Sequence, residues 1–522
     1  MDTQTKKRRG SARQAKHAQR LHKTTKAQPP VRAGFKGGHY KPLSQRDIER
    51  VHTAALDVLE RVGMADAPSV LLDLACAKGC KVNTQGRLCF PRAFVEDIVA
   101  NSASRVVLHG REERHDLDIS GSRVHYGTGG AAVKVLDPDN NAYRSSTLTD
   151  LYDFARLVDR LDNVHWFTRC VIATDLEDWL EFDLNTAYAC VAGTSKHIGT
   201  AITVAENVAP IVTMFDAVLG GEGRFRERPF CKLHTSPIVP PLRYGEDACK
   251  VIAQAVRLGM PINAITAAQS GATAPAPLAG TLVQTVAETL AALIFVQLLK
   301  PAHPFVFSNW PFVSDLRTGA FSGGGGEEAV LNAAAAQMSN FYGLPSGVAA
   351  GMTDSKIPDE QAGYEKALTT VLAGVAGANL VYESAGMLAS LLGCSFEAFV
   401  IDDEMLGFVQ RAVRGIEISE ETLAVDLIEE TVNGAGHFLG AGQTLEIMES
   451  EYVYPKLGDR HTPEEWQEKG ATDIRERARV RAREILGEHY PSYIPPDVDA
   501  DLRRRFPIRL PQSAMSPQCG RW

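Results

Sequence analysis

The sequence predicts an α/β fold, a (β/α)8 TIM barrel with an α-rich N-terminal cap and a helical C-terminal extension. First, strand-like segments alternate with helical patterns from residue 123 to residue 385, which is typical of a parallel sheet with crossover helices. Second, there are eight such strands, the number in a closed barrel. Third, Gly127-Thr128-Gly129-Gly130 lacks the third glycine of a dinucleotide-binding turn, which disfavours the competing open doubly wound sheet.

The predicted strands and helices of the barrel follow one another along the chain. The strand-like segments are "RVHYGTGGAAVKVLD", "VHWFTRCVIA", "KHIGTAIT", "PFCKLHTSPIV", "PINAITAAQS", "PFVFSNWPF", "GLPSGVAAGM" and "ANLVYESAGM". The helices predicted between them cover residues 148–160, 178–191, 205–219, 245–258, 279–299, 327–341 and 359–376.

The regions on either side of the barrel differ from it in composition. The cap begins with a helix whose N-cap is Ser44 and whose apolar residues recur at helical spacing. After the barrel the chain becomes helical and acidic, with helices predicted over 386–392, 402–414, 418–432 and 463–487 and an extended, proline-ordered stretch from Tyr490. The sequence therefore divides into a disordered basic tail (1–36), a mostly helical cap (37–122), the barrel (123–385), a helical extension packed on the barrel (386–510) and a flexible tail (511–522).

Charge is distributed unevenly. Residues 1–36 hold eleven Lys and Arg against one Asp, a net charge of +10, which leaves −18 for the rest of the chain. We interpret the basic segment as a solvated tail. A nucleic-acid arm is disfavoured because no aromatic residue for base stacking precedes Phe35 and because the body is acidic. No nucleic-acid partner is expected.

The overall composition indicates a cytoplasmic protein without a metal site. Hydrophobic residues make up 44% and charged residues 23% of the chain, which is typical of a soluble globular protein. No run approaches the ~18–20 apolar residues of a membrane span, and the first 30 residues lack the apolar core of a secretory signal. The nine cysteines form no disulfide framework. Cys76 and Cys80, with His52 upstream, are too few ligands for zinc.

Candidate functional residues cluster after the predicted strands, where a barrel of this kind holds its active site. Five aromatic residues could offer their faces to a methylated ammonium cation: Trp310, Phe312, Phe321, Tyr364 and Tyr382. Asp354 and Glu383 could compensate its charge, and we take them as the catalytic candidates. Taken singly, the residues of "TDSKIPDEQ" also suit a turn and a helix start, since Pro358 fits the first helical position.

Several common catalytic arrangements are missing from the sequence. It shows no Ser-His-Asp arrangement, no zinc ligand set and no nicotinamide fingerprint. The glycines of "SGGGGEEAVL" could bind an anion at a helix start, but no Lys-Ser/Thr follows them, so a nucleotide P-loop is excluded. The site is therefore predicted to hold a small charged molecule, with the hard chemistry brought from elsewhere.

Three segments resemble a known family. "FSGGGGEEAVLNAAAAQMSNFYGLP", "GMTDSKIPDEQAGYEKALTTVLAGVAGANLVYESAGML" and "FPIRL" are similar to the trimethylamine–corrinoid methyltransferases, in the branch without pyrrolysine, and the resemblance covers roughly residues 34–510. It implies a TIM barrel that passes a methyl group from a methylated amine to the cobalt of a separate corrinoid protein. It also implies self-association, and a corrinoid supplied by the partner rather than bound tightly by this chain.

The resemblance bears on the substrate as well. Because the chain has only standard residues, it resembles the demethylases of quaternary amines such as glycine betaine more than the pyrrolysine-containing trimethylamine enzymes. For a betaine carboxylate the candidate ligands are Lys356, Arg317 and His234, with Gln269 as a further polar contact. Lys356 could equally be a solvated turn lysine. This function predicts that Asp354→Ala abolishes methyl transfer and leaves the fold intact.

Two other interpretations stay open at this point, a non-catalytic binder of quaternary amines and trimethylamine itself as the methyl donor. A thiol-directed methyltransferase is rejected, because related enzymes of that kind use a His-x-Cys zinc pattern that this sequence lacks.

Overall fold

The computed structural model describes residues 29–522, so most of the predicted basic tail lies outside the described residues. At the centre is a curled sheet of nine strands in the order β1-β6-β20-β19-β16-β14-β11-β10-β9. The short β1 (Phe35–Lys36) is antiparallel to β6, and the other neighbours are all parallel. The parallel strands are β6 (Arg123–Tyr126), β9 (Trp166–Thr168), β10 (His197–Thr200), β11 (Cys231–Thr235), β14 (Ile262–Thr266), β16 (Phe305–Asn309), β19 (Ser346–Ala349) and β20 (Leu380–Tyr382).

The two outermost parallel strands of this order also touch each other. Gly127, directly after β6, forms a parallel bridge with Trp166 of β9. The backbone N–H of His165 donates to the carbonyl of Tyr126 at 2.7 Å. The N–H of Thr168 donates to the hydroxyl of Thr128 at 2.8 Å. The sheet thus curls far enough to bring β6 beside β9.

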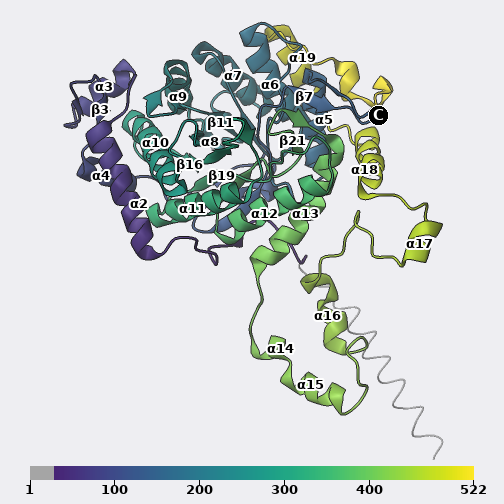
Figure 1. The fold of residues 1–522 in the computed structure, drawn as a ribbon. Helices are drawn as coiled ribbons and strands as arrows, with labels where there is room; N and C mark the ends of the chain where they lie inside the picture. Colours follow the sequence, from purple (N-terminus) through teal and green to yellow (C-terminus); the bar gives the residue numbers. More distant parts are fainter. Residues whose placement is uncertain (1–28) are drawn as a thin grey trace, which may run out of the picture. The chain divides into compact units, whose positions relative to one another are not determined.

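Helices cover the outer side of the strands, as the ribbon in Figure 1 shows. Each prediction between residues 148 and 376 corresponds to a helix within a few residues of the expected bounds. These helices are α5 (Leu148–Asp159), α6 (Trp179–Gly193), α7 (Val208–Val218), α9 (Glu246–Leu258), α10 (Leu278–Leu299), α11 (Gly326–Tyr342) and α12 (Glu360–Val375). Side-chain caps explain several starts. Thr147 and Asp150 form a capping box on α5, and Asp359 accepts from Ala362 N–H on α12.

The N-terminal region contains the elements that the sequence predicts. Ser44 caps α2 (Gln45–Asp57) by accepting from Asp47 N–H, as expected. A two-stranded sheet and two further helices complete the region. They are β2 (Lys81–Val82) with β3 (Leu88–Cys89), α3 (Ser69–Cys76) and α4 (Arg92–Ala100).

Helix α10 corrects one prediction. Among the described residues it is the one helix long and apolar enough to cross a membrane, with a mean hydropathy of 1.8 over its 18-residue window. The expectation that no segment approaches that length was therefore wrong. However, 78% of this window is buried inside the protein, where α10 packs on α2, β14 and β16. Burial on all sides explains a helix that is apolar all round.

The region after residue 385 differs from the prediction in three places. The residues expected as a helix over 386–392 form β21 (Met387–Leu388), which pairs with β22 (Gly393–Cys394). The stretch expected to be extended contains α19 (Pro496–Arg505). The extension is not continuous either, because residues 415–454 belong to a separate compact unit. The remaining helices are α13 (Phe396–Arg414), α14 (Glu420–Leu423), α15 (Val425–Val432), α16 (Gly442–Glu451), α17 (Pro463–Glu468) and α18 (Ile474–Glu488).

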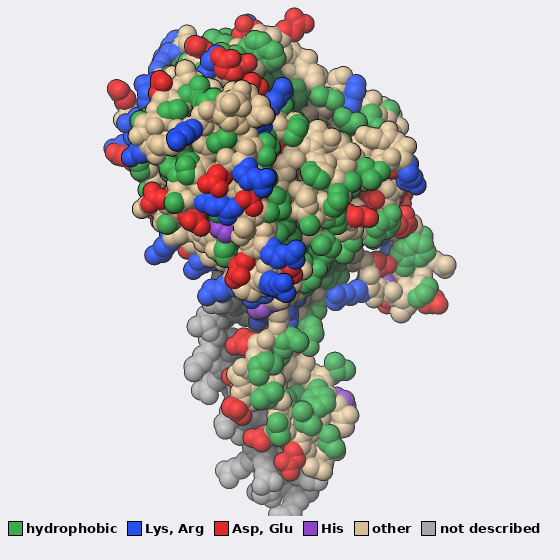
Figure 2. Space-filling model, turned by 60° about the vertical axis from the view of Figure 1, so that its left-hand side comes forward, with side chains coloured by type: hydrophobic (Ala, Val, Ile, Leu, Met, Phe, Trp, Pro, Cys, Tyr) green, Lys and Arg blue, Asp and Glu red, His purple; other side chains and the backbone are tan. Residues whose placement is uncertain are grey.

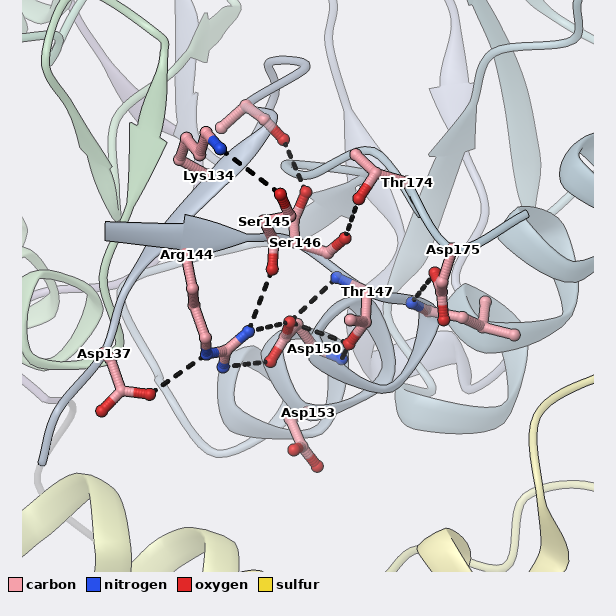
Figure 3. Close-up of polar contacts among 12 residues, drawn as sticks. Lys134, Asp137, Arg144, Ser145, Ser146, Thr147, Asp150, Asp153, Thr174 and Asp175 are labelled. Atoms are coloured by element: carbon pink, nitrogen blue, oxygen red, sulfur yellow. Dashed lines mark hydrogen bonds and ion pairs between the residues drawn. The ribbon is translucent and has the colours of Figure 1, made fainter. Parts of the chain in front are cut away.

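The last residues, predicted as a flexible tail over 511–522, include two that contact α5. Arg521 forms ion pairs with Asp150 at 2.5 Å and with Asp153 at 2.6 Å, and the Trp522 indole N–H donates to Asp153 at 2.9 Å. Asp150 also accepts hydrogen bonds from both terminal nitrogens of Arg144 (Figure 3). Arg144 lies in β8 (Tyr143–Ser145), which forms a hairpin with β7 (Lys134–Leu136), so this contact links the hairpin to α5. These buried carboxylates satisfy cations from two distant segments.

Candidate active site

An aromatic cluster lies at the carboxyl ends of β16 and β20 and includes Trp166, the first residue of β9. The rings of Trp310 and Tyr382 are 5.1 Å apart between centroids, and Trp166 lies 5.2 Å from Tyr382. Phe312, in β17 (Phe312–Ser314), lies 6.2 Å from Trp310 and packs edge-on at 4.9 Å against Phe321, in β18 (Phe321–Ser322). The structure therefore brings together four of the five aromatic residues that the sequence singled out.

Tyr364, the fifth aromatic candidate, lies outside this cluster. It is 64% exposed on α12. The buried positions of that helix are Ala362, Lys366, Thr369 and Thr370, so its geometry turns Tyr364 to solvent. The structure therefore does not bring Tyr364 together with the other four aromatic candidates.

Two of the proposed carboxylate ligands are also placed elsewhere. The Arg317 side chain is 88% exposed and pairs with Asp315 at 2.8 Å, because a tight turn brings the two residues together. Lys356 is exposed, and its ammonium donates to the backbone carbonyl of Asp354 at 2.6 Å. Both are local turn contacts rather than parts of the aromatic cluster.

His234 and Gln269 do lie beside the cluster. The His234 ring is 5.3 Å from Tyr382 and 5.6 Å from Trp310. Its Nδ1 is 2.8 Å from the Asn263 side-chain amide, whose oxygen accepts from Ser308. This assigns Nδ1 as an acceptor, and burial holds the pKa of His234 well below its usual value, so the ring is neutral. Gln269, in β15 (Gln269–Ser270), pairs in register with Phe312.

Asp354 joins three loops. One carboxylate oxygen accepts from the Ser322 hydroxyl at 2.8 Å, and the other accepts from Gly323 N–H at 2.8 Å and from the Ser390 hydroxyl at 2.5 Å. Its own N–H donates to Glu365 at 2.9 Å. Asp354 is thus a positioning residue that ties the strand carrying Phe321 to the loops after β19 and β20.

Glu383 is a buried carboxylate next to Tyr382 of the aromatic cluster. It follows β20, is fully buried, and has no hydrogen-bond partner for either oxygen among residues 29–522. Burial raises its pKa to about 8, although nearby Arg169 acts in the opposite direction. Its φ of 60° lies in the left-handed region, which costs a non-glycine residue energy and is frequent at functional sites.

Two glycines make room for this carboxylate. A Cβ on Gly129 would lie 2.9 Å from one Glu383 oxygen, and a Cβ on Gly130 would lie 3.0 Å from the other. The GTGG segment after β6 therefore serves to admit a buried glutamate.

Two cations that the sequence interpretation missed lie beside these groups, the fully buried Lys232 and the partly buried Arg169. The Lys232 ammonium lies 5.4 Å from the Trp166 ring centroid and 5.5 Å from that of Tyr382, and burial lowers its pKa to about 7. Arg169 donates to the Gly130 carbonyl at 3.0 Å, while its Nε has no partner among residues 29–522. Alternation in "CKLHT" puts Lys232 on the same face as His234, a signal that could have identified it.

Two N–H groups of the glycine-rich segment before α11 are occupied by carboxylates of the protein itself. Gly323 N–H donates to Asp354, and Gly324 N–H donates to Glu328 at 2.9 Å, so the anions there are the protein's own carboxylates. Burial, together with the charges of Asp354 and Glu365, raises the pKa of Glu328 to about 8. Within residues 29–522, no three His, Cys, Asp or Glu side chains are placed to hold a metal ion.

A curled parallel sheet with an aromatic, cationic and acidic cluster near its strand ends is the kind of arrangement that suits a small charged organic molecule. The family described as trimethylamine methyltransferase (MTTB) matches residues 6–511, and the chain belongs to this family. It is accordingly a methyltransferase, and a non-catalytic binder is not favoured.

Characterised relatives agree with that assignment. Trimethylamine methyltransferase MttB of Desulfitobacterium hafniense (strain DSM 10664 / DCB-2) is 33% identical over 462 residues, 88% of this chain and 92% of that protein. The MttB of Methanosarcina thermophila is 32% identical over 479 residues, 90% of this chain and 98% of that protein. Glycine betaine methyltransferase of D. hafniense (strain Y51) is 29% identical over 465 residues, 89% of this chain and 96% of that protein.

Proposed function

We propose that this methyltransferase moves a methyl group from a quaternary amine of the betaine type to the cobalt(I) of a corrinoid carried by a separate protein. The observation that carries the proposal is the buried aromatic cluster of Trp166, Trp310, Phe312 and Tyr382 with Glu383 at its edge, in a chain of this family. Aromatic faces attract a desolvated ammonium, and a carboxylate compensates its charge.

The chemistry suits such a site. A quaternary ammonium is an electrophile whose leaving group is a neutral amine, so the chain itself needs no nucleophile. The corrinoid supplies the nucleophile when its carrier docks. The chain's residues exclude water, hold the ammonium against the rings and aim one methyl group outward. No residue of this chain is assigned as a corrinoid ligand, and none is needed if the carrier protein holds the corrinoid and this chain binds the methyl donor.

Charge in the site favours a zwitterionic donor over trimethylamine. Near pH 7 the Glu383 carboxyl, with its pKa of about 8, is largely neutral, whereas Arg169 is charged and Lys232, with its pKa of about 7, is partly charged. The buried groups therefore carry excess positive charge. A betaine brings a carboxylate that Lys232 and Arg169 can bind, while its ammonium favours ionised Glu383. These two cations replace Lys356 and Arg317 as the proposed carboxylate ligands.

The proposal also includes a closed barrel and a cytoplasmic location. The bridge between Gly127 and Trp166 supports a closed (β/α)8 barrel, in which the site lies at the carboxyl ends of the strands. A docking carrier protein would approach that end. A cytoplasmic location goes with this partner, and the burial of the one long apolar helix is consistent with it.

The proposed function is tested by methylation of cobalt(I) cobalamin, followed by its absorbance change, with glycine betaine, other betaines, carnitine and trimethylamine as donors. We expect methylation with at least one betaine. Isothermal calorimetry with the same compounds separates a need for the cognate carrier protein from a failure to bind. Methylation by trimethylamine alone would overturn the choice of donor, and absence of binding to every amine would overturn the function.

Asp354→Ala is expected to lower kcat/KM by about a hundredfold, because loss of this carboxylate releases the loops that position Phe321. The unpaired donors of Ser322, Gly323 and Ser390 should also cost ~1–3 kcal/mol of stability. Asp354→Asn keeps one acceptor oxygen, so its kcat/KM and its stability should lie between those of Asp354→Ala and the unaltered protein. Steady-state kinetics and thermal unfolding of both variants check this, and full activity in Asp354→Ala would contradict the positioning role.

A further inference from the structure

The backbone after β20 is strained at Glu383 and must be held by its surroundings. Glu383 has a φ of 60°, and a residue with a side chain stays in this left-handed region only where neighbouring contacts fix the backbone. Three residues on, Gly386 has a φ of 83°, and a Cβ there would lie 2.2 Å from the Phe399 ring. The segment from Glu383 to Gly386 is therefore a tight turn whose contacts decide where the carboxylate lies.

Ser384 fixes the first half of this turn. Its N–H donates to the carbonyl of Gly127, directly after β6, at 3.1 Å. Its hydroxyl donates to the carbonyl of Val381, in β20, at 2.6 Å. The residue next to the glutamate is thereby bound to two strands of the central sheet.

The second half of the turn is bound to one partner of a buried ion pair. Gly386 N–H donates to a carboxylate oxygen of Asp402, in α13, at 2.8 Å, and the Lys366 ammonium, in α12, lies 2.6 Å from the same oxygen. The Gly386 carbonyl accepts from Ser395 N–H at 3.0 Å. On the face drawn in Figure 2, Lys, Arg, Asp and Glu side chains lie scattered over the surface, whereas the Lys366 and Asp402 side chains are 2% and 4% exposed.

Stability alone does not explain this pair. Taking an ammonium and a carboxylate out of water carries a large desolvation cost, and apolar replacements of a buried ion pair are often equally stable. The pair joins α12 to α13, which lie side by side in Figure 1, and it ends on the backbone three residues from Glu383. The ammonium fixes the direction of the carboxylate, and the carboxylate in turn fixes the Gly386 N–H.

We propose that Asp402 and Lys366 are positioning residues that hold Glu383 beside the aromatic cluster by anchoring the turn at Gly386. The strained backbone of Glu383 is then fixed from both directions, by Ser384 on the sheet and by Gly386 on α13. This inference rests on the proposed function in one respect, the role of Glu383 opposite the ammonium. The placement of Glu383 itself can be measured without any methyl donor.

Two double variants separate the anchor from the buried charges. Lys366→Met with Asp402→Asn removes both charges and keeps an oxygen that can accept from Gly386 N–H. Lys366→Met with Asp402→Leu removes both charges and the acceptor as well. We expect kcat/KM for a betaine to fall at most about twofold in the Asn double variant and at least about tenfold in the Leu double variant, because the turn is released only in the second.

The titration of Glu383 is the measurement that a merely structural role would leave unchanged. Carbon-13 NMR of protein labelled at the glutamate carboxyl carbon, with Glu383→Gln to assign the signal, follows this group in each variant. We expect a pKa of about 8 in the unaltered protein and in the Asn double variant. In the Leu double variant the pKa should lie nearer the ordinary value of 4.5, because release of the turn exposes the carboxyl to water. The ionisable groups that interact with Glu383 stay in place in both: Arg169, Cys170, Glu328 and Tyr382.

Amide hydrogen exchange checks the contact in the unaltered protein. Gly386 N–H should exchange at least about a hundredfold more slowly than an unprotected amide, and this measurement decides even where the Leu double variant does not fold. Equal pKa values of Glu383 in the two double variants, or an unprotected Gly386 amide, would overturn the anchor. Failure of every amine to bind or react would overturn the proposed function instead, since the titration and exchange measurements need no donor.

Discussion

Glu383→Gln is expected to lower kcat/KM for methyl transfer by about a hundredfold or more, because it removes the negative charge that faces the bound ammonium. The side chain keeps its shape, so loss of packing does not explain a loss of activity. Calorimetry should show weaker binding of the donor. Glu288→Gln is a matched control: Glu288 is also a buried glutamate, with its pKa raised to about 7, but it accepts from Leu242 and Gln284. It should retain activity.

The same variant is expected to change how stability depends on pH. Glu383 ionises near 4.5 in the unfolded chain and near 8 in the folded protein. Its contribution to stability is therefore fully present below pH 4.5 and is lost as the pH rises to about 8, since the unfolded chain releases its proton first. Glutamine stays neutral throughout. The melting temperature of Glu383→Gln relative to the unaltered protein should rise between pH 5 and pH 9, and an unchanged difference would contradict a raised pKa.

Gly129→Ala offers an independent check on the placement of this carboxylate. The added methyl group would lie 2.9 Å from a Glu383 oxygen and must displace it, although the charge remains. We therefore expect the activity to fall although the substitution adds or removes no ionisable side chain. Equal activity with alanine would show that Glu383 can move without consequence.

Lys232→Met is expected to change donor preference. Methionine keeps much of the length of the side chain and removes the charge, so kcat/KM for a betaine should fall about thirtyfold or more, the usual effect of removing one partner of a buried charged pair. A donor without a carboxylate should lose little. Because the pKa of Lys232 is about 7, betaine affinity in the unaltered protein should also decline as the pH rises above 7.

Lys356→Met is the matched control for that measurement. This lysine is exposed and bonds only a backbone carbonyl in the described contacts, so the preference among donors should not change. An equal loss for betaine and trimethylamine in Lys232→Met would show that Lys232 supports the site in general. It would also leave Arg169 as the remaining candidate for the carboxylate.

The fold was predictable where local signals agree with the tertiary structure. Ser44 and Thr147 mark helix starts through short-range caps, and the alternation of strands with helices needs only the hydrophobic pattern. The apolar run around residues 386–392 fits a helix or a strand equally well, and pairing of β21 with β22 decides it. This short hairpin is extended by β7, which pairs with β22 and is distant from it in sequence.

The site was predictable in part, for a similar reason. Trp310, Phe312 and Tyr382 follow strands, and strand ends meet at one edge of a parallel sheet. Tyr364 lies outside the cluster because it occupies the solvent-facing side of α12, which its place in the sequence does not reveal. Lys232 was missed because a cation inside an apolar strand becomes meaningful only once its burial is known, and Arg169 because its place beside Gly130 depends on the tertiary structure.

The steric fit between Glu383 and the two glycines after β6 has an evolutionary consequence. A side chain at either glycine would collide with the carboxylate, and a smaller residue in place of the glutamate would leave a gap that a side chain could fill. Descendants of a common ancestor should therefore keep or lose the three positions together. A lineage that has replaced Gly129 and Gly130 should also have lost the glutamate, and with it the ability to use an ammonium donor at this place.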